Sequence, residues 1–172
     1  METQPMQKTI EFDQLTIRNA TRADVPAIVH LLADDVLGQQ RECDQDPLPQ
    51  AYYTAFEQID RDPNNELIVV ELAGEVIGVL QFTLIPSLSF QGGTRAQIES
   101  VRVDQRYRSH GIGRYLFEWA IERARQSGCR MVQLTTNASR GDAHRFYERL
   151  GFVSSHVGMK LDLVRTLSNH PA

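Results

Sequence analysis

The sequence predicts a single mixed α/β domain, in which a central mixed sheet carries helices on both faces. The predicted elements follow one another as strand, two helices, three strands, helix, strand, helix and strand. The chain has 172 residues, of which 41% are hydrophobic, which is enough for one substantial core and too few for a second full domain. We expect one domain over 1–172, with its core at 14–163 and terminal extensions at 1–13 and 164–172.

The first third of the chain predicts a strand followed by two helices. Residues 14–18 alternate apolar and polar side chains, as a half-buried strand does. The stretch TRAD, residues 21–24, has the capping-box pattern, so a helix begins there and ends near Gly38. Residues 39–49 are polar and contain two prolines, which predicts an irregular loop before a second helix over 50–60.

The middle of the chain predicts three strands and a long helix. Residues 66–72 and 76–85 are rich in β-branched residues and form a hairpin, and 95–103 are a third strand. Apolar residues then recur at helical spacing from Ile112 onward, and Gly128 supplies a left-handed stop.

The last third predicts a strand, a helix and a final strand. Residues 131–136 are a short buried strand. Ser139 and Asp142 make a second capping-box pattern for a helix that ends at about Leu150. Residues 152–163 again have strand character.

Charge and hydropathy exclude several functional classes. The net charge of −4 and the isoelectric point near 5.7 argue against a nucleic-acid-binding protein. No apolar run approaches the roughly 20 residues that span a bilayer, and residues 1–13 lack the apolar core of a secretory signal. We therefore expect a cytoplasmic protein without membrane or nucleic-acid partners.

The cysteines and histidines form no metal or disulfide pattern. Cys43 and Cys129 lie far apart and have no CxxC spacing. His110, His144 and His156 are widely spaced, and none is paired at i and i+4. We expect no metal site. His156 could line an acceptor pocket or belong to a surface loop.

The stretch DQRYRSHGIGRYLFEWA, residues 104–120, joins a strand to a helix through a loop rich in glycine and arginine. A helix N-terminus leaves about four backbone N–H groups unpaired and carries partial positive charge, so it favours anions. Gly111 and Gly113 remove side chains there, and Arg106, Arg108 and Arg114 supply charge for two or more phosphates. The pattern predicts a pyrophosphate site.

Two common phosphate-binding loops have patterns that this segment does not match. A Walker loop needs Lys and then Ser or Thr after its last glycine, and Arg114 and Tyr115 stand there instead. The dinucleotide fingerprint needs a third glycine, where this chain has Leu116. The glycines could also allow only a tight turn, with the arginines in solvent.

The segment VRVDQRYRSHGIGRYL resembles the acyl-CoA pyrophosphate loop of the GNAT-type (GCN5-related) N-acetyltransferases. Arg108, Gly111 and Gly113 occupy the positions of that family's loop pattern. AHRFYERLGF, residues 143–152, resembles the family's second signature, one helix and one strand further on. The resemblance implies an acyl-CoA N-acyltransferase domain with a twisted, mostly antiparallel sheet.

The resemblance also implies which residues bind the donor, acetyl-CoA, with no metal. The implied donor-binding residues are Val101, Val103, Arg106, Arg108, Ser109, His110, Gly111, Ile112, Gly113, Arg114 and Arg140. The pantetheine arm is expected to pair with Val101 and Val103 like an added strand. Arg140 stands where the family often has a cofactor-contacting Asn, so it could reach a phosphate or face solvent.

Glu99 is the best-placed carboxylate to take a proton from an attacking amine. A free alkyl amine is only on the order of one part in a thousand neutral at pH 7, and only the neutral form attacks. Strand alternation would put Glu99 on the same face as Val101 and Val103, and the family often has a base here. Glu99 could instead be a solvent-facing or salt-bridged residue.

Tyr147 matches the family's general acid. A phenol with a pKa of about 10 remains protonated beside a thiolate whose conjugate acid has a pKa near 8.5, so it can donate a proton to the leaving group. The alternative is an aromatic packing residue, a role that Phe146 can fill. A backbone N–H near Val101 would polarise the thioester carbonyl.

The segment between the first two predicted helices suggests the acceptor. Its acidic residues Glu42, Asp44 and Asp46, with Tyr52 and Tyr53 just after, suit the primary amine of a small cationic molecule. Alternatives are acetylation of a protein N-terminus or lysine, and a non-catalytic acyl-CoA-binding regulatory module. An exposed final strand could mediate a homodimer, by analogy with relatives.

Overall fold

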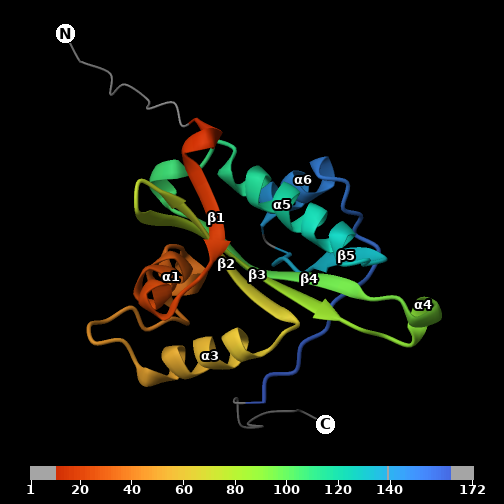
Figure 1. The fold of residues 1–172 in the computed structure, drawn as a ribbon, viewed down its shortest axis with the longest axis horizontal. Helices are drawn as coiled ribbons and strands as arrows, with labels where there is room; N and C mark the ends of the chain where they lie inside the picture. Colours follow the sequence, from red (N-terminus) through yellow and green to blue (C-terminus); the bar gives the residue numbers. More distant parts are fainter. Residues whose placement is uncertain (1–10, 139, 164–172) are drawn as a thin grey trace, which may run out of the picture. The chain divides into compact units, whose positions relative to one another are not determined.

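Five strands form one sheet in the computed structural model, which describes residues 11–138 and 140–163 (Figure 1). They are β1 (Leu15–Asn19), β2 (Asn65–Leu72), β3 (Glu75–Ile85), β4 (Arg95–Val103) and β5 (Met131–Leu134). The strands lie in chain order, and every pair is antiparallel except β4 with β5, which is parallel. The predicted mixed, mostly antiparallel sheet is confirmed.

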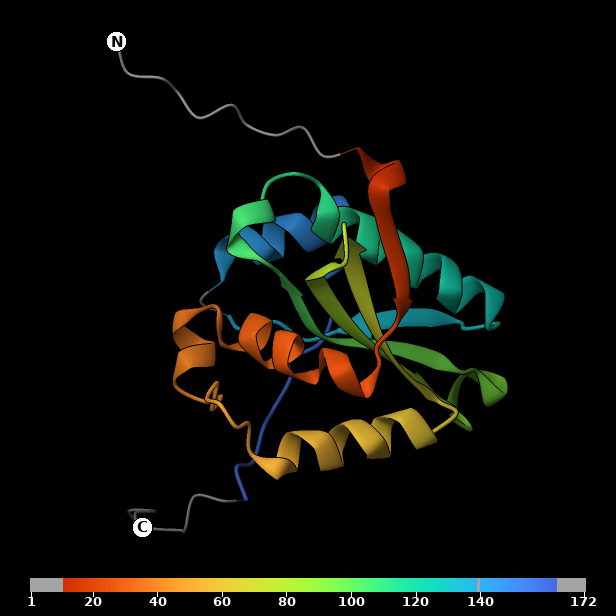
Figure 2. The ribbon, with the colours of Figure 1, turned by 60° about the vertical axis from the view of Figure 1, so that its left-hand side comes forward.

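Helices cover both faces of this sheet (Figure 2). The first face carries α1 (Val25–Ala33) and α3 (Gln50–Arg61), whose apolar side chains pack with Val69 and Val79 of β2 and β3. The opposite face carries α5 (Ile112–Gln126), where a side chain at Gly78 would meet Leu116 at 3.4 Å. These are called the α1/α3 face and the α5 face below.

Short turns complete this part of the chain. They are η1 (Phe12–Gln14), η2 (Arg22–Asp24), α4 (Ser89–Gly92) and η3 (Gln105–Tyr107). The predicted capping box forms at η2, where the Thr21 N–H donates to Asp24 at 2.7 Å, and the turn leads directly into α1.

The predicted first helix is two helices. α1 ends at Ala33, and a separate α2 (Val36–Gln39) follows it. Asp35 between them is extended, with φ −150° and ψ 163°, and its carboxylate accepts from the Gly38 N–H at 2.7 Å. The chain turns sharply here, since a Cβ at Gly38 would lie 2.1 Å from the Leu32 carbonyl oxygen. Val36, which would continue the apolar stripe of Val25, Ile28 and Val29 if the helix ran on, is 72% exposed.

The chain divides into two compact units, the second of which begins at Thr135. It contains α6 (Gly141–Arg149), which ends one residue before the predicted end at Leu150, and Gly151 follows at φ +91°. Ser139 of the predicted capping box lies outside the described residues.

The predicted strand over 152–163 is wrong, because these residues form no strand in the structure. Their alternating apolar side chains remain exposed, with Val157 92% and Met159 94% accessible. A strand needs a neighbouring ladder as well as an alternating pattern. No strand among the described residues pairs with this segment.

Candidate active site

β5 pairs with only the first half of β4. The paired residues run from Arg95 opposite Met131 to Ile98 opposite Leu134. Beyond Ile98, β4 continues to Val103, and among the described residues no strand lies against its β5-side edge. An edge of this kind can accept an extended ligand as an added strand.

A β-bulge in β4 changes which residues share a face. Ser100 has φ +55°, and the pairing with β3 shifts by one residue between Val79 and Gln81. Glu99 pairs with Gln81 and therefore lies on the α1/α3 face, whereas Val103 pairs with Gly78 on the α5 face. The prediction that Glu99 shares a face with Val103 is wrong, because the extra residue breaks the alternation.

The loop after β4, residues 104–111, is called the anion loop here. It begins with Asp104, which is buried at 7% exposure and accepts from the Arg106 backbone N–H at 2.8 Å. The Arg106 guanidinium also bonds this carboxylate, with Nε 3.0 Å from Oδ1, and this contact holds the pKa of Asp104 below its ordinary value. Arg106 further pairs with Glu75 at the start of β3.

The anion loop enters α5 through two residues in the left-handed region, Ser109 at φ +66° and Gly111 at φ +83°. Gly111 is the N-cap of α5, no side chain caps this terminus, and no acidic residue lies in its first turn. The first-turn N–H groups of Ile112, Gly113 and Arg114 therefore have no partner within the helix. An uncapped helix N-terminus attracts negative charge.

Gly111 has a packing reason as well as a conformational one. A Cβ there would come within 3.0 Å of the Phe12 ring, which also lies 5.4 Å from the Tyr115 ring. Phe12 therefore covers the start of α5 beside the anion loop. A glycine predicted to make room for a ligand also makes room for the chain's own N-terminal segment.

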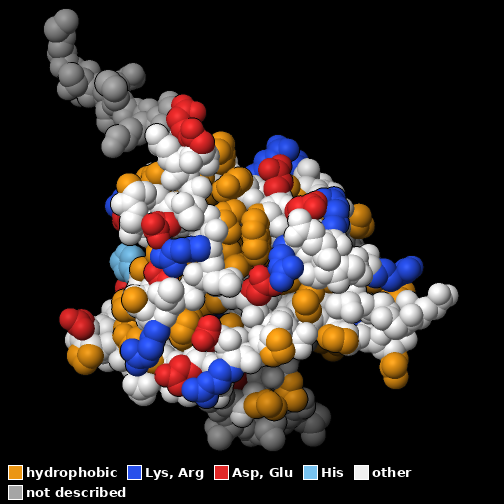
Figure 3. All heavy atoms as spheres, in the orientation of Figure 1, with side chains coloured by type: hydrophobic (Ala, Val, Ile, Leu, Met, Phe, Trp, Pro, Cys, Tyr) orange, Lys and Arg blue, Asp and Glu red, His pale blue; other side chains and the backbone are white. Residues whose placement is uncertain are grey.

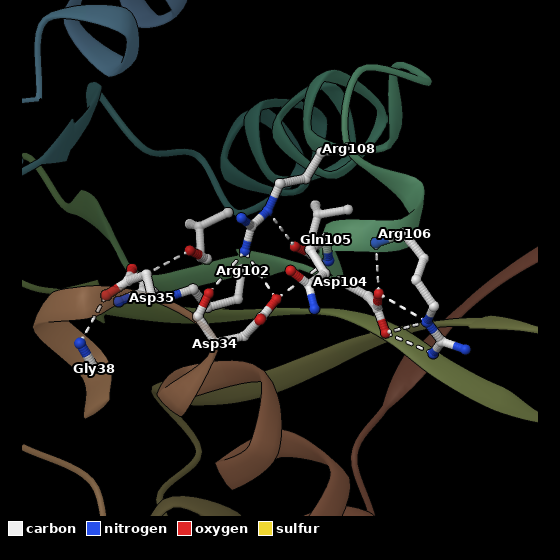
Figure 4. A network of polar contacts seen from close by, with 10 residues as sticks. Asp34, Asp35, Gly38, Arg102, Asp104, Gln105, Arg106 and Arg108 are labelled. Carbon is white, nitrogen blue, oxygen red and sulfur yellow. Dashed lines mark hydrogen bonds and ion pairs between the residues drawn. The ribbon is translucent and has the colours of Figure 1, made fainter.

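The three arginines predicted to bind phosphate all take part in ion pairs. Arg106 pairs with Asp104 and Glu75, and Arg114 pairs with Glu118 one turn along α5 at 2.7 Å. Arg108 binds Asp34 at the end of α1, with Nη2 2.9 Å from Oδ2 (Figure 4). Both Arg114 and Arg108 keep about half or more of their side chain accessible, at 70% and 47%.

Asp34 and Asp35 together join the α1–α2 corner to β4 and the anion loop (Figure 4). The Asp34 carboxylate accepts from the Gln105 backbone N–H at 3.2 Å as well as from Arg108. Asp35 lies 3.5 Å from the Arg102 guanidinium on β4. Sequence reasoning missed these two carboxylates, because no local motif marks a contact with residues about seventy positions further along.

The residues predicted to bind the acceptor, here called the acceptor rim, are Glu42, Asp44, Asp46, Tyr52 and Tyr53. They contact the helices around them. Asp44 binds His30 of α1, with 2.8 Å between Oδ2 and Nδ1. The Tyr52 hydroxyl accepts from the Cys43 N–H at 2.8 Å and donates to Glu42, and burial raises the pKa of Tyr52.

Tyr53 and Asp46 complete the predicted rim. The Arg22 guanidinium lies 4.4 Å from the centre of the Tyr53 ring, and Asp46 precedes Pro47 in a cis peptide bond. Tyr52 and Tyr53 both pack against the core of the α1/α3 face, which is the face on which Glu99 lies.

The other predicted site residues, Arg140 and Tyr147, belong to the second unit. Arg140 precedes α6, and its carbonyl accepts from the His144 N–H at 3.2 Å. The Tyr147 ring lies between those of Phe146 and Phe152, with centroids 5.4 Å and 6.1 Å away. The catalytic role of Tyr147 and the phosphate contact of Arg140 stay predictions.

The described residues hold neither a metal-binding cluster nor a membrane-spanning helix. Within 11–138 and 140–163, no group of three or more His, Cys, Asp or Glu side chains is arranged to hold a metal ion. In the same residues, no helix combines the length and the apolar character that crossing a bilayer requires.

The open edge of β4 and the uncapped N-terminus of α5 beside it suit an extended ligand that carries negative charge. Residues 33–152 match the model of the acetyltransferase (GNAT) family. Since the match covers more than half of the chain, the chain belongs to this family, and the predicted membership is confirmed.

Two relatives extend this assignment. The aminoalkylphosphonate N-acetyltransferase of Salmonella typhimurium is 32% identical over 140 residues, which are 81% of this chain and 86% of that protein. The L-methionine sulfoximine/L-methionine sulfone acetyltransferase of Pseudomonas aeruginosa is 30% identical over 151 residues, 84% of this chain and 86% of that protein. With the family match, they identify the chain as an acetyl-CoA-dependent N-acetyltransferase.

A solved structure similar to this chain is described as a transcriptional regulator. The protein, from Bacillus halodurans C-125, is 52% identical, with a TM-score of 0.85 over 87% of this chain and 99% of that one.

Proposed function

We propose that the chain transfers the acetyl group of acetyl-CoA to the primary amine of a small cationic molecule by direct attack. Glu99 is the general base and Tyr147 the general acid. The observation that carries the proposal is the open edge of β4 beyond Ile98, next to the uncapped N-terminus of α5. An extended arm can pair with this edge while its phosphates meet the helix N-terminus.

The faces of β4 support the role of Glu99. Glu99 is exposed and lies on the α1/α3 face. Tyr52 and Tyr53 pack on the same face, just after the acidic loop, which is the segment that carries Glu42, Asp44 and Asp46. An amine bound from this side would meet the carboxylate before it meets the thioester. The carboxylate takes the ammonium proton, directly or through water, and the neutral amine then attacks the thioester carbonyl.

The remaining steps are stabilisation of the thioester oxygen and protonation of the leaving sulfur. The backbone N–H groups near Val101 stabilise the negative charge that develops on the thioester oxygen. When the C–S bond breaks, the phenol of Tyr147 gives its proton to the departing sulfur, and the products are an amide and free CoA. The amine supplies the electron pair, so no oxidant or reductant takes part.

The proposed acceptor is a small molecule rather than a protein. The relatives act on an aminoalkylphosphonate and on methionine derivatives, and these are small compounds that carry a primary amine. The carboxylates of Glu42, Asp44 and Asp46 favour a cationic acceptor. Acetylation of a protein N-terminus or lysine is the alternative.

Calorimetric titration with acetyl-CoA followed by a thiol-release screen tests the proposal. The screen compares polyamines, aminoglycosides, aminoalkylphosphonates, amino acids and a peptide with a free N-terminus. Turnover with a small amine supports the proposal, and turnover with the peptide alone contradicts the acceptor class. Asp44→Asn should then raise the KM of the accepted amine and leave the Kd of acetyl-CoA unchanged, as should Asp46→Asn.

The mechanism has its own test once an acceptor is known. Glu99→Gln should lower kcat by about 10²–10⁴-fold at neutral pH. The deficit should shrink as the pH approaches the pKa of the amine, because solution then supplies the neutral form. Tyr147→Phe should lower kcat most at pH values below about 8.5, the ordinary pKa of a thiol, where the departing sulfur takes up a proton. A pH-independent deficit in Glu99→Gln would show that Glu99 does not act as the base.

The Bacillus halodurans relative raises a second candidate, a donor-binding protein that regulates transcription. Two observations argue against direct contact with nucleic acid. The net charge is −4, and acidic and basic side chains are interleaved on the face that Figure 3 shows. Binding of acetyl-CoA without turnover of any amine would favour this candidate.

A further inference from the structure

The anion loop is fastened to α1 by a carboxylate that simple electrostatics would not put there. Asp34 bonds the Gln105 N–H and the Arg108 guanidinium, and its side chain is 17% exposed. The proposed donor carries several phosphate charges. A carboxylate beside its binding loop should weaken the attraction for an anion, unless it contributes something that outweighs the repulsion.

Arg108 uses much of its donor capacity on the protein itself. Its Nε donates to the Val103 carbonyl at 3.1 Å, and its Nη2 donates to the carbonyl and to Oδ2 of Asp34, at 3.1 Å and 2.9 Å. A guanidinium has five N–H donors, so three of them join the end of β4 to the end of α1. Arg108 therefore spans the start of the anion loop as a brace.

Arg108 directly precedes the residues whose backbone conformation leads the chain into the N-terminus of α5. Ser109 and Gly111, both at positive φ, follow Arg108 and lead into α5. A non-glycine residue at positive φ is strained and persists only where its surroundings hold it. Asp34, from a separate part of the chain, supplies such a hold through Arg108 (Figure 4).

We infer that Asp34 is a positioning residue for the acyl donor: through Gln105 and Arg108 it fixes the anion loop so that the N-terminus of α5 is ready for phosphates. The inference rests on the proposed donor site. Asp34 touches neither the donor nor the reacting atoms, and it lowers the cost of ordering the loop when the donor binds. Arg108 acts chiefly through this brace.

The sign of one mutational effect separates positioning from charge. If charge dominates, Asp34→Ala and Asp34→Asn remove a repulsion, release Arg108, and both tighten acetyl-CoA. If Asp34 positions the loop, Asp34→Ala weakens binding about tenfold. Asp34→Asn should recover part of this loss, because the amide oxygen can still accept from the Gln105 N–H.

Calorimetric titration of the full chain with acetyl-CoA is the test, with Arg108→Ala and the Asp34→Ala/Arg108→Ala double variant included. The double variant should bind about as weakly as either single variant, since both remove the same brace. Glu118→Ala is the matched control, because it removes a carboxylate paired with an arginine near the same helix terminus. It should change the Kd by less than about twofold.

Three outcomes would overturn the inference. Equal or tighter binding by Asp34→Ala would do so, as would losses that add in the double variant, and both would leave the donor site intact. Absence of binding by the wild-type chain would overturn the proposed donor site and the inference with it. If Asp34→Ala does not fold, the partial loss expected of Asp34→Asn carries the test.

Discussion

The backbone angle of Ser100 decides what Glu99 faces. At φ +55° Ser100 adds one residue to β4 without adding one to β3. Glu99 and Val103 consequently point to opposite faces of the sheet, which regular alternation would not allow. The proposed base can thus lie with the acidic loop while the end of the strand lies with α5.

Asp24 gives a second residue-scale effect, on stability. The hydrogen bonds from Arg18, 2.7 Å and 2.9 Å long, lower the pKa of Asp24 to about 2. The folded chain therefore holds Asp24 ionised where the unfolded chain, at its ordinary pKa of about 3.9, begins to bind a proton. This stabilisation is fully present above pH 5 and is lost as the pH falls toward 2.

Asp24→Asn should reduce the free energy of unfolding by about 2 kcal/mol at pH 7. The difference from wild type should shrink as the pH falls below about 4 and should vanish only below pH 2, where Asp24 is protonated in the folded state as well as in the unfolded state. Denaturant unfolding at several pH values measures it, with the exposed Asp60→Asn as control. A difference that stays constant from pH 7 to pH 2 would mean that the ion pair with Arg18 is not its source.

At the scale of elements, the N-terminus of α5 lacks the residues that usually stabilise a helix start. Neither a capping side chain nor an acidic first-turn residue satisfies it, although such residues commonly stabilise a helix by about 0.5–2 kcal/mol. Arg114, in the first turn, has the charge that opposes the helix dipole. A negative side chain in this turn would stabilise the helix, whereas a positive one favours anion binding.

Arg114→Glu should separate these two effects. The new carboxylate complements the dipole, so the unfolding temperature should hold or rise, while acetyl-CoA binding should weaken by at least about tenfold. Arg125→Glu makes the same charge change at the other end of α5, where the side chain is equally exposed at 70%. It should leave the Kd within about threefold and lower the stability slightly. Equal losses of binding in both variants would indicate a general charge effect.

Gly38 makes a second element-scale prediction, at the α1–α2 corner. A Cβ at this position would lie 2.1 Å from the Leu32 carbonyl oxygen, which is backbone and cannot swing aside. Gly38→Ala should therefore lower the free energy of unfolding by at least about 2 kcal/mol.

The same substitution at Gly141 is the control for Gly38→Ala. The nearest atom to a Cβ at Gly141 is a guanidinium nitrogen of Arg145, 3.5 Å away. Gly141→Ala should change the stability by less than about 1 kcal/mol. Denaturant unfolding of both variants decides the comparison, and equal stabilities would mean that the corner can relax.

At the scale of the whole molecule, the pattern of elements predicted the sheet and the helices on its faces. Local signals sufficed for β4, for α5 with its stop at Gly128, and for the capping box at Thr21. The break at Asp35 and the bulge at Ser100 were not predicted, because both depend on contacts with distant parts of the chain. The strand expected over 152–163 failed for a related reason, since alternation cannot show whether a partner strand exists.

Some residues of the candidate site could be predicted from the sequence and others could not. The glycines and arginines of the anion loop carry a motif that can be found in the sequence. Asp34 carries none, since its partners Gln105 and Arg108 lie 71 and 74 residues away along the chain. Phe12, which lies against Gly111, carries none either, because it precedes the first predicted strand.

Acetyl-CoA should stabilise the folded chain. A ligand at a hundredfold excess over its Kd contributes about 2.7 kcal/mol, or roughly 5–10 °C in Tm for a chain of this size. Thermal unfolding with and without acetyl-CoA measures it, with acetate as the control for the acetyl group alone. No shift at saturating acetyl-CoA would contradict the proposed donor site.

The open edge of β4 also has a cost when no donor is bound. An exposed strand edge is a template on which another chain can pair, and such pairing leads to aggregation. The bulge at Ser100 interrupts the regular edge just beyond Ile98, so a foreign strand finds only a short and twisted length to pair with. The bulge beside the proposed donor site therefore also limits pairing of this edge with other copies of the chain.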